Sequence, residues 1–382
     1  MKKQNLFALK REKVFLITKG EKMSSKEIIS EASNKKIRTV AYKGSKRKLL
    51  GDIQCLADEI NAKTVFDGFS GTGIVSAFLR RNGMKVYAND LNFSSYLYGK
   101  VFLEGYDEKE VQNHIKIMNS LKPIEGWLTE NYSGTKKRKV RTLKGLHERP
   151  LAYRRKNAMK IDAAREYIDA NENIGDEARN ALIFGVVLAA DSVFNNSNDQ
   201  KSSLKNWSKK ANKEVEFVAP TLIEGAKGEQ FIGDIFSTDI PQDVDMVYYD
   251  PPYTSGVLYG SCYHLNDTIA IWDKPTLQFD YALPRPERAS YRSKNVGSFY
   301  SKKTVKDDFR KILSSAKKAR RIVLSYSDAP RNAIEIGELE NVCREFGGVE
   351  VRHREHKICT QIKSQVRRSE KLQEFFILVD PK

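Results

Sequence analysis

Cysteine is scarce in this sequence, and the four cysteines show no paired spacing. They are Cys55, Cys262, Cys343 and Cys359. This argues against a disulfide framework and against a zinc ribbon. His353, His356 and Cys359 follow one another at ligand-like intervals, but no fourth ligand stands near them. We therefore predict that the protein binds no metal.

Long apolar runs are also missing, since none reaches the roughly 18 residues that a membrane span requires. The basic N-terminus is not followed by a signal-peptide core and cleavage site. We expect a cytoplasmic protein without a membrane partner. Acidic residues are outnumbered, with 49 Asp and Glu against 66 Lys and Arg and a net charge of +17. Such an excess suits a polyanion, although a charged tail or a need for solubility would also explain it.

The apolar periodicity predicts an α/β fold. A strand is expected at 63–69, a helix at 72–82, a strand at 85–89 and a helix through Phe102. Strands that alternate with helices are typical of a parallel sheet. Helical patterns also fill 157–197, whereas 136–141 and 149–156 are basic clusters that we expect in a loop.

A glycine-rich turn joins the first of these strands to its helix, and it contains Asp67, Gly68, Gly71 and Gly73. Glycines let the backbone approach a ligand closely, and the start of a helix offers free N–H groups. Asp67 favours an amino group over a pyrophosphate, which a carboxylate would repel. Asp90 ends the next strand, where an acid accepts ribose hydroxyls, unless it merely caps the following helix.

The segment Asp250-Pro251-Pro252-Tyr253 follows a strand at 245–249. A carboxylate accepts N–H groups, a proline-locked backbone directs a carbonyl outward, and an aromatic ring stacks. The segment can therefore hold a planar group that bears an amine. A plain turn at the end of a strand is the alternative when the segment is considered alone.

Together these segments resemble the D12 class of site-specific DNA adenine-N6 methyltransferases. The resemblance covers roughly residues 38–330 and rests on the order of the motifs, which are 42–47, 67–73, Asp90, 157–162, 233–236, 250–253, 263–270 and 323–327. Ser45 departs from the class, where a second glycine is common. The resemblance implies a Rossmann-like fold with a mostly parallel, doubly wound sheet and an inserted, largely helical DNA-recognition region. It also implies S-adenosyl-L-methionine as cofactor and membership, as for many of the class, in a restriction–modification system.

The domain boundaries follow from this assignment. We expect a basic arm at 1–36, a methyltransferase domain formed by 37–105 and 228–382, and an inserted target-recognition region at 106–227. A second candidate DNA-contact segment lies at 274–301.

The resemblance also assigns roles to individual residues. It implies that the cofactor-binding residues are Tyr42, Lys46, Asp67, Gly68, Phe69, Gly71, Gly73, Asp90, Asp234 and Asp250. Tyr42 and Lys46 would close over the methionine end, Asp90 would bind the ribose and Asp234 the adenine amine. A solvated lysine at a helix start and an ordinary turn acid are the alternatives for Lys46 and Asp234.

The catalytic residues are predicted to be Asp250, Pro251, Pro252 and Tyr253. Hydrogen bonds from adenine N6 to the Asp250 carboxylate and the Pro251 carbonyl would restore electron density to the nitrogen. Pro252 would hold the turn, and Tyr253 would stack on a base that has left the duplex. This mechanism needs no metal.

Double-stranded DNA is the expected partner, with a cognate restriction endonuclease as a further candidate. Phosphate contacts are predicted for Lys136, Lys137, Arg138, Lys139 and Arg141, with a solvated loop as the alternative. Base contacts are predicted for Arg285, Arg288 and Arg292, beside Tyr291, because arginine pairs well with guanine. The sequence does not indicate an oligomeric state.

Three other functions are compatible with parts of the pattern. The acceptor could be RNA or a protein amide, although related tetrapeptides for those substrates usually begin with Asn, and Asp250 favours DNA. A DNA-binding protein on a decayed methyltransferase fold is disfavoured by the intact Asp90, Asp250 and Tyr253. A nicotinamide dehydrogenase is disfavoured because no hydride-transfer His or Lys accompanies the glycines.

Overall fold

The structure, a computed structural model, describes most of the chain after the N-terminal arm. The described residues are 36–133, 138–142, 145–149, 151–196, 199–252, 259–278, 283–289, 299, 301–330, 332–357 and 371–382. The predicted arm at 1–36 therefore lies outside them apart from Lys36.

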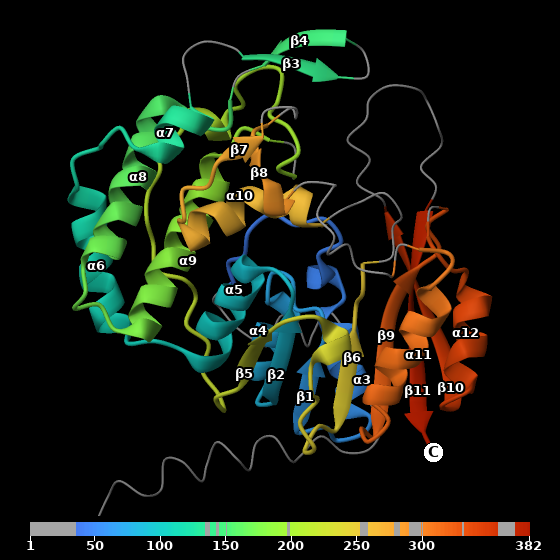
Figure 1. Cartoon of the computed structure of the whole chain (residues 1–382). Coiled ribbons are helices and arrows are strands. Elements are labelled where there is room, and N and C mark those ends of the chain that lie inside the picture. Colours follow the sequence, from blue (N-terminus) through green and yellow to red (C-terminus); the bar gives the residue numbers. More distant parts are fainter. Residues whose placement is uncertain are drawn as a thin grey trace, which may run out of the picture.

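A seven-stranded sheet forms the centre of the molecule (Figure 1), in the order β10-β11-β9-β6-β1-β2-β5. Its strands are β1 (Thr64–Asp67), β2 (Lys85–Asp90), β5 (Glu229–Ile232), β6 (Met246–Tyr249), β9 (Arg321–Ser327), β10 (Gly347–Lys357) and β11 (Lys371–Pro381). The five adjacent strands β9, β6, β1, β2 and β5 are parallel to one another, whereas β11 runs antiparallel to β9 and to β10. The predicted mostly parallel, doubly wound sheet is confirmed.

The order of the strands reverses between β1 and β6. From β1 the chain builds outward through β2 and β5, and it then returns to the other side of β1 to add β6 and β9. Val65 pairs with Val86 on one side and with Met246 on the other. In open α/β sheets, ligands bind outside the carboxyl ends of the strands at such a reversal. The topology therefore directs attention to the ends of β1, β2 and β6.

Helices cover both faces of the sheet (Figure 1). They include α3 (Leu50–Asp58), α4 (Ile74–Arg81), α5 (Phe93–Glu104), α11 (Val305–Ser315) and α12 (Ile336–Arg344). Alternate strand residues enter two separate buried clusters, because successive side chains of a strand point to opposite faces. Val65 packs in the cluster with α3, α4 and α5, whereas Phe66 packs in the cluster with α11 and α12.

The inserted region is largely helical, as predicted. It contains α6 (Glu108–Ser120), α7 (Trp127–Tyr132), α8 (Arg155–Ala170) and α9 (Asp176–Val193). The buried carboxylate of Asp162 on α8 accepts the amides of Leu128 and Thr129 at 2.9 and 2.8 Å, which fixes α7 against α8. One apolar cluster continues from the sheet into α8 and α9, so this region shares the core of the sheet.

The basic cluster at 136–141 was predicted as a loop, and this was wrong for its described part. β3 (Arg138–Thr142) pairs antiparallel with β4 (Gly145–Arg149). An isolated parallel bridge between Ser133 and Tyr153 joins the segments that lead into and out of this hairpin. Figure 1 shows the hairpin beyond α7, on the carboxyl-end side of the sheet.

The remaining elements of the described chain are short, apart from one helix. They are α10 (Tyr259–Ile271), the two-stranded β7 (Leu277–Gln278) and β8 (Arg285–Pro286), and four short 3-10 helices, η1 (Lys46–Lys48), η2 (Lys210–Asn212), η3 (Ile235–Ser237) and η4 (Glu287–Ala289). Within the described part of the chain, every helix is too short or too polar to span a bilayer.

Candidate active site

Three aspartates gather where neighbouring parallel strands end. Asp67 is the last residue of β1, Asp90 is the last residue of β2, and Asp250 directly follows β6. Because β1 lies between β2 and β6, the three carboxylates share one edge of the sheet. Burial is the main cause of the raised pKa of Asp67, and the charges of Asp250 and Asp90 raise it further, since both lie close to it. The structure thus brings together three of the four acids that the sequence singled out.

Asp67 is almost fully buried, with 1% of its surface exposed. Its Oδ2 accepts the Ser76 hydroxyl at 2.6 Å, whereas Oδ1 completes no hydrogen bond within the described residues. Burial raises the pKa of this carboxyl to about 7, although the Ser76 hydroxyl and the Phe69 amide lower it. A buried acceptor without a donor is costly. Asp67 Oδ1 is therefore suited to a donor that arrives with a ligand.

The glycine turn after Asp67 is held close to the neighbouring strand. The Gly68 amide donates to the Tyr248 carbonyl at 2.9 Å, and a Cβ at Gly68 would come within 2.5 Å of the Tyr249 ring. Gly71 and Gly73 have φ of +52° and +70°, a region that favours glycine. The backbone conformation at Gly71 and Gly73 and the close neighbour at Gly68 therefore account for glycine at the three positions, while their contact with a cofactor stays a prediction.

Tyr42 covers this turn. A Cβ at Gly71 would lie 3.6 Å from the Tyr42 ring, which stacks on Tyr263 of α10 with a centroid distance of 4.2 Å. The Tyr263 hydroxyl in turn accepts the Lys43 amide at 2.7 Å. The segment before η1 is therefore attached to α10 above the glycine turn. Tyr263 was not singled out from the sequence as a site residue, although it begins the 263–270 motif.

Asp90 fixes the other side of the turn. Its Oδ2 accepts the Gly71 amide at 2.8 Å and its Oδ1 accepts the Asn92 amide at 2.9 Å. Asn92, and not Asp90, is the residue that precedes the first turn of α5, so the helix-cap alternative for Asp90 does not hold. Burial raises the pKa of the Asp90 carboxyl to about 6, and the two amides lower it.

Apolar side chains stand unusually exposed beside Asp90. Leu91, Ile232 and Phe236 expose 55%, 49% and 36% of their surfaces. Phe236 also stacks on Phe299, which contacts Phe69 edge-to-face. Exposed apolar groups around a polar edge are typical of a ligand site. Sequence reasoning missed Leu91 and Ile232, because single apolar residues at strand ends look like ordinary core positions.

Asp234 has the geometry of a turn acid. It precedes η3, and its Oδ1 accepts the Phe236 amide at 3.1 Å. The described contact of Asp234 is thus a local one, with Phe236 of the exposed apolar group. Its binding to a ligand stays a prediction.

Asp250 is paired with a buried lysine. Lys46 Nζ lies 2.9 Å from Asp250 Oδ1 and 2.7 Å from Glu374 Oε1, and 6% of the Lys46 side chain is exposed. The alternative of a solvated lysine at a helix start was therefore wrong. Although 19% of the Asp250 side chain is exposed, burial raises the pKa of its carboxyl to about 6. Lys46 lowers that pKa and Glu374 raises it.

The rest of the predicted catalytic segment is described in part. Pro251 is buried and Pro252 half-buried, whereas Tyr253 lies outside the described residues. Glu374, from β11, was missed by sequence reasoning because nothing in its local sequence indicates a catalytic neighbourhood.

The predicted DNA contacts are divided among several places. Arg138, Lys139 and Arg141 belong to β3, whereas Lys136, Lys137, Tyr291 and Arg292 lie outside the described residues. Arg288 is exposed and forms a two-point ion pair with Asp273 at 2.8 and 3.1 Å. Arg285 is only 3% exposed. This burial contradicts the prediction that Arg285 contacts base edges, since its guanidinium does not reach the surface.

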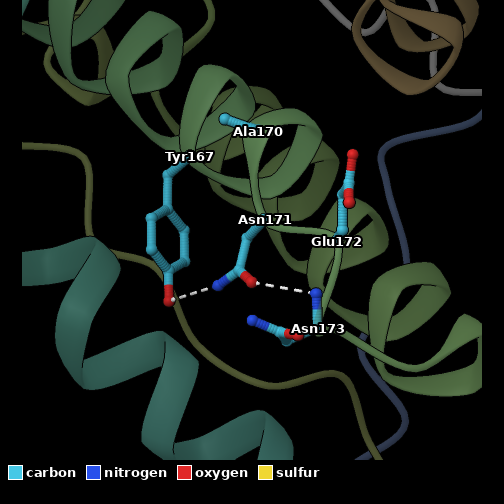
Figure 2. Close-up of a pocket in the computed structure, with 5 residues that line it drawn as sticks. All are labelled: Tyr167, Ala170, Asn171, Glu172 and Asn173. Atoms are coloured by element: carbon cyan, nitrogen blue, oxygen red, sulfur yellow. Dashed lines mark hydrogen bonds between the residues drawn. The ribbon is translucent and has the colours of Figure 1, made fainter.

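One hollow in the structure has no connection with these residues. It has a volume of about 450 Å³ and is lined by the end of α8, from Tyr167 and Ala170 to Asn171, Glu172 and Asn173. Figure 2 shows that its hydrogen bonds are local, from Asn171 Nδ2 to the Tyr167 hydroxyl and from the Asn173 amide to Asn171 Oδ1. No strand-end acid takes part in it.

Comparison with known proteins identifies the family to which this arrangement is similar. The family model of the D12 class N6 adenine-specific DNA methyltransferases matches residues 42–335. That range contains the glycine turn and all three strand-end aspartates, whereas Glu374 lies beyond it.

Several curated proteins are similar over most of this chain. The Type II methyltransferase M.NlaIII of Neisseria lactamica is 27% identical over 335 residues, which are 83% of this chain and 91% of the relative. M.CviAII of Paramecium bursaria Chlorella virus 1 is 28% identical, over 86% and 94% of the two chains. M.FokI of Planomicrobium okeanokoites is 29% identical over 71% of this chain, but over only 43% of its own length.

Proposed function

This chain belongs to the D12 class of N6 adenine-specific DNA methyltransferases, and on that basis we propose the following function. The protein transfers the methyl group of S-adenosyl-L-methionine to N6 of an adenine that is extruded from a specific double-stranded DNA sequence. The observation that carries the proposal is the convergence of Asp67, Asp90 and Asp250 at the edge where the strand order reverses. RNA or a protein amide as the methyl acceptor fits the family less well, and so does a non-catalytic DNA-binding protein.

The residues at this edge fit the proposed cofactor. S-adenosyl-L-methionine supplies an electrophilic methyl group on a sulfonium. The buried Asp67 Oδ1, which lacks a donor among the described residues, is suited to the cationic amino group. Asp90 retains lone pairs for ribose hydroxyls, because each carboxylate oxygen can accept more than one hydrogen bond. Leu91, Ile232 and Phe236 offer apolar surface for an adenine ring.

Asp250 and Pro251 act on the target base. The N6 lone pair of adenine is delocalised into the ring, so N6 is a weak nucleophile. An ionised Asp250 and the Pro251 carbonyl accept its two N–H groups and return electron density to the nitrogen. The two prolines fix these acceptors in advance, which is the source of electrostatic preorganisation. Asp250 can also accept the proton that N6 releases.

The base must leave the helix before it can reach this edge. Extrusion costs a few kcal/mol, and stacking on an aromatic side chain returns about 1–3 kcal/mol. Tyr253 is proposed for this stacking on the strength of the Asp-Pro-Pro-Tyr motif. The net charge of +17 favours DNA as the partner, because phosphate neutralisation releases counterions.

A role in a restriction–modification system is proposed from the relatives, which are named Type II methyltransferases. The enzyme would then protect one short sequence against a cognate endonuclease. Single-molecule sequencing of DNA from cells that express the chain tests this point. We expect N6-methyladenine at every copy of one short sequence; methylation without sequence context would contradict the role.

The chemistry is tested by transfer of labelled methyl to unmodified duplex DNA. We expect Asp250→Ala to lower kcat by about 10³-fold, the upper range for loss of one preorganised partner of the transition state. Asp243→Ala is the matched control, since Asp243 is an exposed acid before β6, and it should keep wild-type activity. Transfer to RNA or to protein in place of DNA, or full activity of Asp250→Ala, would contradict the proposal.

A further inference from the structure

Glu374 completes a buried charge cluster with Lys46 and Asp250. The Lys46 ammonium lies between the two carboxylates, at 2.9 Å from Asp250 and 2.7 Å from Glu374. Their side chains expose 6% for Lys46, 19% for Asp250 and 12% for Glu374. We propose that Glu374 is a positioning residue for methyl transfer, which acts through Lys46 to keep the Asp250 carboxylate available to the adenine amine. The inference rests on the proposed function.

The sheet holds Glu374 rigidly. Glu374 is opposite Ser327 in the register of β11 and β9, at the carboxyl end of β9. Its Oε1 accepts both the Lys46 ammonium and the Ser325 hydroxyl, the latter at 2.8 Å. Two donors on one oxygen leave the carboxylate little freedom. The position of Lys46 is therefore set by two strands of the sheet and does not depend on Asp250 alone.

Charge balance gives this arrangement a consequence for catalysis. Without Glu374, Lys46 and Asp250 would form a neutral pair. In a partly dehydrated site the two charges would attract each other strongly, and the ammonium would take up the acceptor capacity of the Asp250 carboxylate. A second carboxylate shares the ammonium and leaves the cluster with a net charge of −1. Asp250 then keeps more of its acceptor strength for the N–H groups of adenine.

The other groups that face Asp250 do not replace Glu374. Asp67, from β1, is itself an acid; burial is the main cause of its raised pKa, and the charge of Asp250 raises that pKa further. Tyr248, from β6, is buried, and burial raises the pKa of its hydroxyl well above the usual value. Lys46 is thus the cation and Glu374 the acid that most directly set the charge around Asp250.

The test compares Glu374→Gln with the wild-type chain and with Glu350→Gln. Glutamine keeps the shape of Glu374 and an acceptor for Ser325 but removes its charge. Glu350→Gln is the matched control, because Glu350 forms an exposed ion pair with Arg352 on the adjacent β10. Steady-state methyl transfer to DNA is measured from pH 5 to 9, and folding is checked by thermal unfolding.

We expect Glu374→Gln to lower kcat about tenfold, less than the roughly 10²–10³-fold typical of a group that contacts the transition state, because Glu374 acts through Lys46, while both KM values change less than about threefold. The acid limb of the kcat profile should move to lower pH, because removal of the Glu374 charge lowers the pKa of Asp250. Glu350→Gln should match the wild type. A purely structural ion pair would change stability but leave the acid limb in place.

Ser325→Ala provides a second variant for the case in which Glu374→Gln does not fold. It removes one donor from Glu374, and we expect a fall of about threefold in kcat with unchanged KM. Wild-type kcat and an unshifted acid limb in the folded variants would overturn the inference. Absence of DNA methylation by the wild-type chain would instead overturn the proposed function, so the two failures are distinguishable.

Discussion

The carboxyl edge of the sheet and the β3–β4 hairpin carry charges of opposite sign and hold them in different ways. At the edge, Asp67 and Asp90 are fixed by hydrogen bonds to Ser76, Gly71 and Asn92 within a shared core. The hairpin is a separate two-stranded sheet. Two strands alone are marginally stable in water.

This difference matches what each region has to recognise. A methyl transfer requires its partners within fractions of an ångström, so the acids that we propose for the cofactor and the base gain from burial and from backbone contacts. Phosphates attract cations over a Debye length of about 8 Å at physiological salt. A basic strand pair can therefore serve DNA without being locked into the core.

The first way to test this contrast is to remove the charge of Asp67. We expect Asp67→Asn to weaken cofactor binding about 100-fold, since a hydrogen bond to a buried charged group is worth roughly 1.5–3 kcal/mol. Asparagine retains an acceptor for Ser76, so the turn should survive. Isothermal titration with S-adenosyl-L-methionine measures the dissociation constant directly.

Asp234→Asn is the matched control on the same edge. Asp234 is exposed, and its described contact is the local one to the Phe236 amide. We expect a change of less than about fivefold, because an exposed partner gains little from its charge. Equal losses in the two variants would show that burial does not separate the roles of these acids.

Asp67→Asn should weaken cofactor binding but stabilise the folded protein, and the gain in stability should depend on pH. The pKa of Asp67 is about 7 in the folded protein, above the value near 3.9 expected when unfolded. Ionised Asp67 therefore costs stability at pH 8, and this cost falls steadily as the pH drops from about 7 to about 4, where Asp67 is protonated in the unfolded chain as well. We expect Asp67→Asn to be more stable than the wild type by about 4 kcal/mol at pH 8, because the pKa differs by about 3 between the folded and unfolded states, and by only about 1.5 kcal/mol near pH 5.

Chemical denaturation at pH 8, 7, 6 and 5 measures this difference in the free energy of unfolding. If the difference in the free energy of unfolding between Asp67→Asn and the wild type stayed constant over this pH range, Asp67 would not be a buried carboxyl with a raised pKa. The expected combination, a stabler protein with weaker cofactor binding, is what a strained functional site produces.

The sequence predicted the edge well because three signals coincide there. Short apolar strands, glycines with positive φ and acids at strand ends are all local features, and parallel pairing then brings them together. The burial of Lys46 was not predictable in this way. Lys46, Arg47 and Lys48 look like a solvated basic turn, and the second carboxylate that buries Lys46 comes from a strand at the other end of the chain.

The basic segments were predicted less well for a related reason. β3 has the sequence Arg-Lys-Val-Arg-Thr, which lacks the apolar alternation of a half-buried strand, so its pairing depends on β4. Arg285 has the composition of a DNA contact, but tertiary packing of β8 buries it. Charge alone therefore did not distinguish a surface arginine from a buried one.

The register of the hairpin offers the sharpest test on the DNA side. Arg138 pairs with Arg149, whereas Lys139 pairs with Glu148. By sequence the first pair has a formal charge of +2 and the second pair has none, so we expect Arg138 and Arg149 to serve the phosphates more than Lys139 does. Replacing both arginines by glutamine should weaken DNA binding about tenfold and reduce the salt slope by about 1.8, or 0.9 for each phosphate contact.

Lys139→Gln is the control within the same strand, and we expect a loss of less than about twofold in DNA affinity because Lys139 and its register partner Glu148 together carry no net charge. Fluorescence anisotropy at several salt concentrations gives both the affinity and the slope. Methyl transfer at saturating DNA should stay unchanged in the double variant and in Lys139→Gln, since the hairpin forms a sheet separate from the one that carries the strand-end acids. A fall in kcat at saturating DNA would mean that the hairpin also orders the catalytic edge. The proposal that the hairpin serves DNA binding alone, and the sheet edge catalysis, would then be wrong.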